Sequence, residues 1–171
     1  MDPIEKAKDQ MGGVESLISK LPGVKGYREK EMRRDADKQM RDALALQLSD
    51  RRTKITAMQN DLLAAGGLLW MDDLERLVGR LQLLIDRVKT AAYGYSGFFD
   101  IQRVKEDELY ELARFDQALF EDLPRLDTAI ESLGKAIEAN EGIKEAATAI
   151  GNILARMNES FGHRMDAIKE A

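Results

Sequence analysis

The sequence predicts an all-α protein, an elongated antiparallel bundle of about four main helices with a long helical hairpin and a short amphipathic N-terminal helix. Apolar side chains recur at alternating three- and four-residue steps through most of the 171 residues, as in bundles and coiled coils. The composition favours Leu, Ala, Glu, Lys and Arg and includes only three prolines. No segment has the two-residue period of a half-buried strand, so no sheet is expected.

Composition and charge exclude several classes of protein. The chain carries 26 basic and 31 acidic residues and is 44% hydrophobic, too apolar for a disordered chain and too charged for a membrane protein. Its length suits one domain. With no cysteine and one histidine, it offers no disulfide framework, thiol nucleophile or Cys/His zinc site.

The first 26 residues are predicted to form an amphipathic helix and a Pro/Gly linker, and residues 27–171 the bundle domain. Asp2 and Pro3 are typical of a helix start. Pro22, Gly23 and Gly26 interrupt helical structure. The apolar stripe of this helix is the candidate contact for a partner or a membrane, and comprises Ile4, Met11, Val14, Ile18 and Leu21.

A single long helix is expected from Tyr27 to about Ala65, because this stretch contains neither proline nor glycine. Its second half gains leucines and should be the packed half. Between Arg28 and Lys54, nine cations alternate with six acids, which predicts a solvated face of opposite charges three or four residues apart. One aromatic residue in this stretch, Tyr27, gives little support to nucleic-acid binding.

Gly66 and Gly67 predict a turn that returns the chain antiparallel to itself. They lie inside an uncharged run of ten residues, LLAAGGLLWM, at residues 62–71. This run is too short to span a bilayer. It suits a buried helix junction or an interfacial contact.

The helix after this turn is predicted to be the central one. Its main apolar row comprises Trp70, Leu74, Leu77, Leu81, Leu84, Val88, Ala91 and Tyr95, and a second row lies beside it. Two glycines and four aromatics then interrupt the pattern. The aromatics, which either plug one end of the core or form a docking patch, are Tyr93, Tyr95, Phe98 and Phe99.

The remaining sequence predicts two more helical stretches. Residues 101–123 resume helical spacing, and Pro124 either kinks this helix or begins another. Residues 140–142 predict a turn before a last helix over residues 143–168. Between Asp100 and Glu145 there are thirteen acids and six cations, so this half is acidic, which favours internal helix pairing or head-to-tail association.

The candidate chemistry is sparse. His163 and Glu159 are four residues apart and are interpreted as a surface pair rather than metal ligands. A cluster of acids is interpreted as a solvated helix start, because its spacing does not match a calcium loop; it comprises Glu106, Asp107, Glu108 and Glu111. No phosphate-binding loop or nucleophile elbow is present. We therefore predict no catalytic residue, no cofactor and no metal.

The sequence favours a noncatalytic scaffold or adaptor that acts through protein–protein association and forms a homo-oligomer. A cytoplasmic location is expected, because charges occupy the first residues where a signal peptide needs an apolar core. An N-terminal amphipathic helix followed by a helical hairpin resembles, in architecture alone, membrane-remodelling coat proteins. The alternative is therefore a peripheral membrane protein that places residues 2–21 in the interface.

Overall fold

The computed structural model describes residues 27–91 and 106–170. Within its helices, the side chains of residues 27–37, 106–114, 116 and 167–170 are not described. The predicted N-terminal helix, its linker and the aromatic segment at residues 93–99 lie outside the described residues. The division of the chain at residue 26 therefore stays a prediction.

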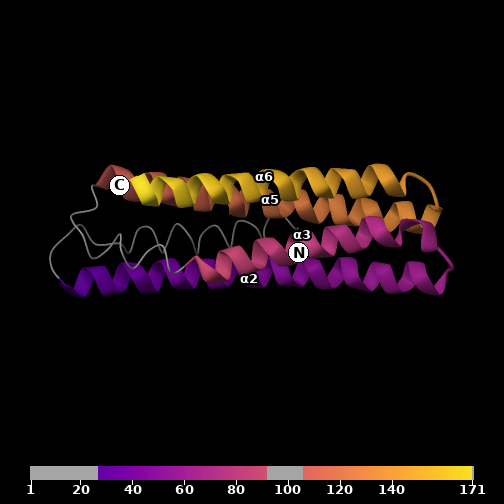
Figure 1. Ribbon diagram of the computed structural model, residues 1–171, viewed down its shortest axis with the longest axis horizontal. Coiled ribbons are helices and arrows are strands. Elements are labelled where there is room, and N and C mark those ends of the chain that lie inside the picture. The colour runs from indigo at the N-terminus through magenta and orange to yellow at the C-terminus, as the bar shows by residue number, and fades with distance from the viewer. Residues whose placement is uncertain (1–26, 92–105, 171) are drawn as a thin grey trace, which may run out of the picture.

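Four long helices and one short 3-10 turn make up the regular structure of the described ranges (Figure 1). They are α2 (Tyr27–Ala64), η1 (Leu68–Trp70), α3 (Met71–Thr90), α5 (Glu106–Ala139) and α6 (Ile143–Glu170). α2 and α3 form one antiparallel hairpin, and α5 and α6 form another. The two hairpins lie along each other as a long, narrow bundle, which confirms the predicted all-α fold.

The two hairpins pack so that each helix of one lies beside a parallel helix of the other. Arg51 on α2 contacts Asp127 on α5, and Met58 lies against Gly134, so both pairs are offset by 76 residues. On the other side, Arg87 of α3 bonds Asn158 of α6, at an offset of 71 residues. Because the residue numbers of the contacting pairs increase in the same direction along both helices, α2 runs parallel to α5. Both hairpin turns consequently lie at the same end of the bundle (Figure 1).

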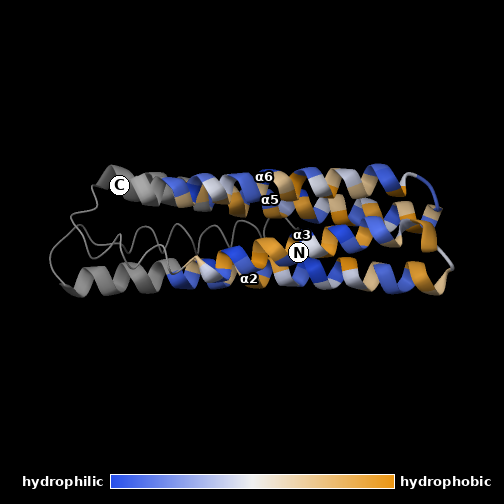
Figure 2. Cartoon of the chain, viewed as in Figure 1, coloured by the Kyte–Doolittle hydropathy of each residue, from blue (hydrophilic) through white to orange (hydrophobic). Residues whose placement is uncertain are grey.

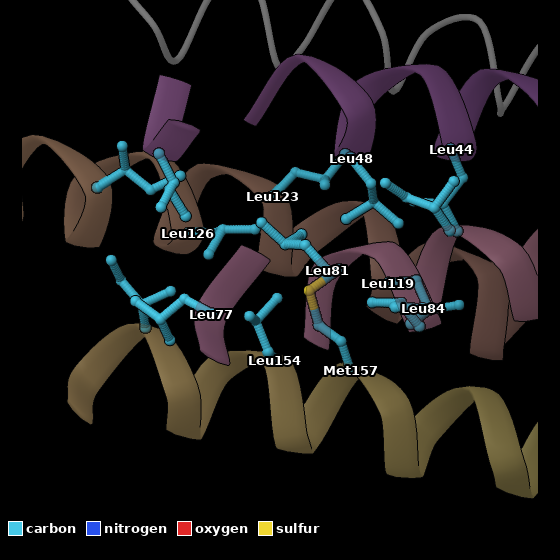
Figure 3. Packing of buried hydrophobic residues seen from close by; sticks show 14 of the residues in the cluster. Leu44, Leu48, Leu77, Leu81, Leu84, Leu119, Leu123, Leu126, Leu154 and Met157 are labelled. Atoms are coloured by element: carbon cyan, nitrogen blue, oxygen red, sulfur yellow. The ribbon is translucent and has the colours of Figure 1, made fainter. Parts of the chain in front are cut away.

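The core is a continuous leucine-rich seam contributed by all four helices (Figure 3). Six members of the row predicted for α3 are buried: Leu74, Leu77, Leu81, Leu84, Val88 and Ala91. Trp70, the first member, is half-buried, and Tyr95, the last, lies outside the described residues. On α2, Leu44, Leu48, Ile55 and Leu62 are buried, so the second half of the helix is packed, as predicted. Alternating three- and four-residue steps keep each seam facing its neighbours, which explains why four separate helices share one core.

Both hairpin turns are closed by the same helix-ending motif. At the end of α2, Gly66 donates to the Leu63 carbonyl and Gly67 to the Leu62 carbonyl. At the end of α5, Asn140 donates to Ile137 and Glu141 to Ala136. Gly66 and Asn140 have φ values of 79° and 53°, the left-handed conformation that this motif requires. The turns predicted at 66–67 and 140–142 are confirmed.

Pro124 lies inside α5, which continues without a break from Glu106 to Ala139. Of the two sequence alternatives, the one in which a new helix begins at Pro124 is therefore wrong. The proline has no N–H to donate to the carbonyl four residues earlier, so α5 lacks one backbone hydrogen bond there.

The solvated-face interpretation of the basic stretch is wrong for two of its arginines. Arg41 and Arg51 are only 5% and 7% exposed. Both lie on the seam of α2, in step with Leu44, Leu48 and Ile55. A residue on the seam faces the other helices whatever its charge, so these guanidinium groups are buried and must find partners there.

Arg41 and Arg51 find those partners on different helices. Arg41 donates from Nη1 to the carbonyls of Val88 and Lys89, at 3.3 and 3.4 Å, where the last turn of α3 leaves carbonyls without helical partners. Arg51 donates to Asp127 Oδ2 at 2.5 Å and to the side chain of Gln47 at 2.9 Å. One arginine thus ties α2 to α3, and the other ties the first hairpin to the second.

Candidate interaction surface

None of the site residues predicted from the sequence lies within the described residues. The candidate contact stripe Ile4, Met11, Val14, Ile18 and Leu21 precedes residue 27, and the aromatic group Tyr93, Tyr95, Phe98 and Phe99 falls between residues 91 and 106. Their roles stay predictions. The candidate surface among the described residues lies instead in the uncharged run at residues 62–71.

Three exposed leucines, here called the leucine apex, lie where α2 ends and the chain turns toward α3: Leu63, Leu68 and Leu69. Their exposed fractions are 51%, 68% and 78%. Leu63 belongs to the last turn of α2, and the other two form the start of η1. Figure 2 shows the hydrophobic colouring reaching this end of the bundle.

The same connection is anchored by other side chains. Leu62 is buried, and Trp70 and Met71 are half-buried against the core. The Trp70 amide also donates to the Gly67 carbonyl, which closes the 3-10 turn. Since these contacts already hold the turn, the leucine apex is not needed to anchor it. Residues 62–71 thus combine both sequence alternatives, a buried junction and an exposed apolar surface.

Clustering distinguishes the leucine apex from other exposed leucines. Leu46 and Leu83 are also more than half exposed, but each stands in the middle of a long helix. Single exposed leucines are normal on soluble proteins. Three within seven residues of one connection are unusual, because connections ordinarily use polar turn residues. The apex is therefore the candidate interaction surface of the described part of the chain.

Acidic side chains dominate the end of the bundle that carries the apex. Residues 59–76 and 135–146 form this end and contain seven acids and three cations. Asp61 and Asp72 flank the apex on α2 and α3, and Glu141 lies in the α5–α6 turn; all three are exposed. The apex is thus an apolar patch in an acidic setting.

Several other charged groups in the described helices are paired with neighbouring side chains. The buried carboxylate of Asp122 accepts from Arg125 at 2.8 Å and from Arg156 on α6 at 2.6 Å. The guanidinium of Arg87 bonds Asn158 and lies over the Phe161 ring, and that of Arg164 also lies over this ring. These charge-assisted bonds join α5 and α3 to α6.

His163 and Glu159 form the surface pair predicted from their spacing. His163 Nε2 lies 3.7 Å from Glu159 Oε1, and both side chains are more than half exposed. Among the described residues, no group of three or more His, Asp or Glu side chains could hold a metal ion. The side chains of the acidic cluster at Glu106, Asp107, Glu108 and Glu111 lie outside this description. No described helix is both long and apolar enough to cross a membrane.

Comparison with family models, curated proteins and solved structures finds no match for this chain. The leucine apex was partly indicated by the sequence, because residues 62–71 form an uncharged run of ten residues around a predicted turn. The pattern does not separate the leucines that pack from those that project. That assignment depends on the angle at which α3 leaves the turn.

Proposed function

We propose that this protein is a noncatalytic helical scaffold that acts through protein–protein association, including association with copies of itself. The observation that carries the proposal is the leucine apex, an exposed apolar cluster whose three leucines are not part of the buried core of the described residues. Exposed apolar clusters lose contact with water when a partner covers them, which makes them favoured docking surfaces.

The size of the apex limits the strength of association. Full burial of a leucine side chain stabilises by roughly 1.5–3 kcal/mol, and each apex leucine is already partly covered. Association itself costs at least about 4 kcal/mol of lost freedom of motion. Contacts at the apex alone therefore leave at most about 5 kcal/mol, which corresponds to a Kd of about 0.2 mM or weaker.

Sedimentation equilibrium tests self-association. We expect the mean mass to rise above 19.2 kDa as the concentration increases to about 500 μM, where an interface of this strength is partly populated. Leu68→Ser with Leu69→Ser should reduce this rise. Leu46→Ser with Leu83→Ser, which removes two exposed leucines elsewhere, should not. A monomer at every concentration would reject self-association.

The noncatalytic part of the proposal has its own test. Native mass spectrometry of the intact protein should give the mass of the chain, or of its oligomers, without additional mass. A stoichiometric metal ion or small molecule retained through purification would contradict this part. We also propose a cytoplasmic location, which imaging of the tagged full-length chain would check.

A further inference from the structure

The end of the bundle that carries the leucine apex combines two properties that select a partner. Its centre is apolar, and its surroundings hold seven acids against three cations. The acids are Asp61, Asp72, Asp73, Glu75, Glu138, Glu141 and Glu145. Six of them are exposed, and the half-buried Asp73 lies 3.8 Å from Arg76. Most of this negative charge therefore faces solvent.

We propose that the apex binds a basic amphipathic helix of another protein. The apolar face of such a helix covers Leu63, Leu68 and Leu69, and the Lys or Arg residues beside that face meet the surrounding carboxylates. The inference rests on the proposed function, because both require the apex to be an association surface. It goes further by naming the occupant.

Charge argues against two other occupants of the apex. A second apex would bring Asp61, Asp72 and Glu141 of one copy against the same residues of the other, and like charges in an interface are unfavourable. An anionic membrane presents negative charge as well. Self-association through the apex would therefore have to use a different surface of the second copy.

The geometry also favours a helix over a larger surface. An α-helix with its side chains is about 10–12 Å across, and its apolar stripe places side chains on one face every three or four residues. The apex offers three leucines within seven residues, enough for a few such side chains. Binding should therefore be weak, depend on the leucines and decrease with added salt.

Fluorescence anisotropy with labelled peptides tests the proposal on the full-length protein. The first probe is an amphipathic helix of about 20 residues, long enough to be helical alone, with leucines on one face and lysines beside them. The second has the lysines replaced by glutamates. The third keeps the composition of the first but scrambles the order, so that the apolar face is lost. We expect only the first to bind appreciably.

Matched variants locate the binding site. Leu68→Ser with Leu69→Ser should weaken binding roughly tenfold or more, as expected for central interface residues. Leu46→Ser with Leu83→Ser should leave it unchanged. Circular dichroism must show that each variant remains folded.

A second pair of variants tests the charge. Asp61→Asn with Glu141→Gln should weaken binding and flatten its salt dependence, whereas Glu121→Gln with Glu131→Gln, on exposed positions of α5, should not.

Each contrary outcome is distinct. Equal binding of the lysine and glutamate peptides would overturn the basic partner and leave the proposed function standing. A mass increase that Leu68→Ser with Leu69→Ser reduces is already expected from the proposed function, and the lysine peptide should lower this increase because it covers the same leucines. A mass increase that saturating lysine peptide leaves unchanged would overturn the basic partner at the apex. Flotation with phosphatidylserine vesicles that depends on Leu68 and Leu69 would identify a membrane instead. If Leu68→Ser with Leu69→Ser weakened neither peptide binding nor self-association, the apex would not be the association surface and both proposals would lose it.

Discussion

The contact between Arg51 and Asp127 gives the sharpest test of how the two hairpins are held together. Arg51 Nη2 donates to Asp127 Oδ2 across 2.5 Å, from α2 to α5. The arginine side chain is 8% exposed and the carboxylate 32%. We compare four proteins by urea denaturation followed by helical circular dichroism: the natural chain, Arg51→Met, Asp127→Asn and the double variant.

The partial burial of this ion pair places its coupling free energy between two limits. Exposed ion pairs contribute about 0–1 kcal/mol, whereas breaking a fully buried pair costs about 3–5 kcal/mol. Asp127 is one-third exposed, and its other oxygen has Lys54 at 3.8 Å, so it keeps some stabilisation without Arg51. Arg51 without Asp127 keeps Gln47. We therefore expect a coupling free energy of about 1–2 kcal/mol between the two positions.

An exposed pair on the same helix is the control. Lys38 and Asp42 are separated by 3.2 Å, with both side chains more than half exposed, and the pair should couple by about 0.3–0.5 kcal/mol. Raising the salt concentration from about 0.1 to 1 M should remove most of the coupling free energy between Lys38 and Asp42, but a smaller part of that between Arg51 and Asp127. If Arg51→Met and Asp127→Asn proved additive within about 0.3 kcal/mol, the argument that this contact joins the hairpins would be wrong.

Three further predictions concern stability and use thermal and urea unfolding. Leu81→Ala, in the fully buried seam of α3, should cost about 2–5 kcal/mol, whereas Leu83→Ala on its exposed face should change stability by less than about 0.5 kcal/mol. Gly142→Ala should lower the free energy of unfolding by about 1–2 kcal/mol because φ there is 71°. Gly79→Ala, in a right-handed helix with no atom near the new methyl group, should raise it by about 0.5–1 kcal/mol. A stabilising Gly142→Ala or a destabilising Gly79→Ala would contradict the backbone argument. Pro124→Ala should raise the free energy of unfolding by about 1–3 kcal/mol, since it restores a donor inside α5; an unchanged melting temperature would mean that the helix does not recover the bond.

The helices and turns could be predicted from residues close to one another in the sequence. The three- and four-residue steps on α3 mark the residues that are buried, because a 3.6-residue period places them on one face in any context. Gly66 and the Asn140–Gly142 turn were predicted equally well, since few residues tolerate a left-handed backbone. These features depend on neighbours a few positions away, so the sequence displays them directly.

Partners distant in sequence could not be predicted in this way. Arg41 follows Asp37 by four residues and Arg51 comes directly after Asp50, in a stretch of mixed charge typical of a solvated helix, yet both arginines are buried. Their partners are the last carbonyls of α3 and Asp127, 47 or more residues further on. No local periodicity shows which helix lies opposite an arginine.

The sequence by itself thus determined the all-α class, the helical seams and the two turns, because each follows from backbone geometry and side-chain periodicity. The tertiary structure decided three other things: that α2 lies beside α5 and α3 beside α6, that two arginines enter the core, and that Leu63, Leu68 and Leu69 project while Trp70 packs inward. The physical reason is the same for all three. Each depends on how separate helices meet, and that is set by the burial of the whole core rather than by any one segment.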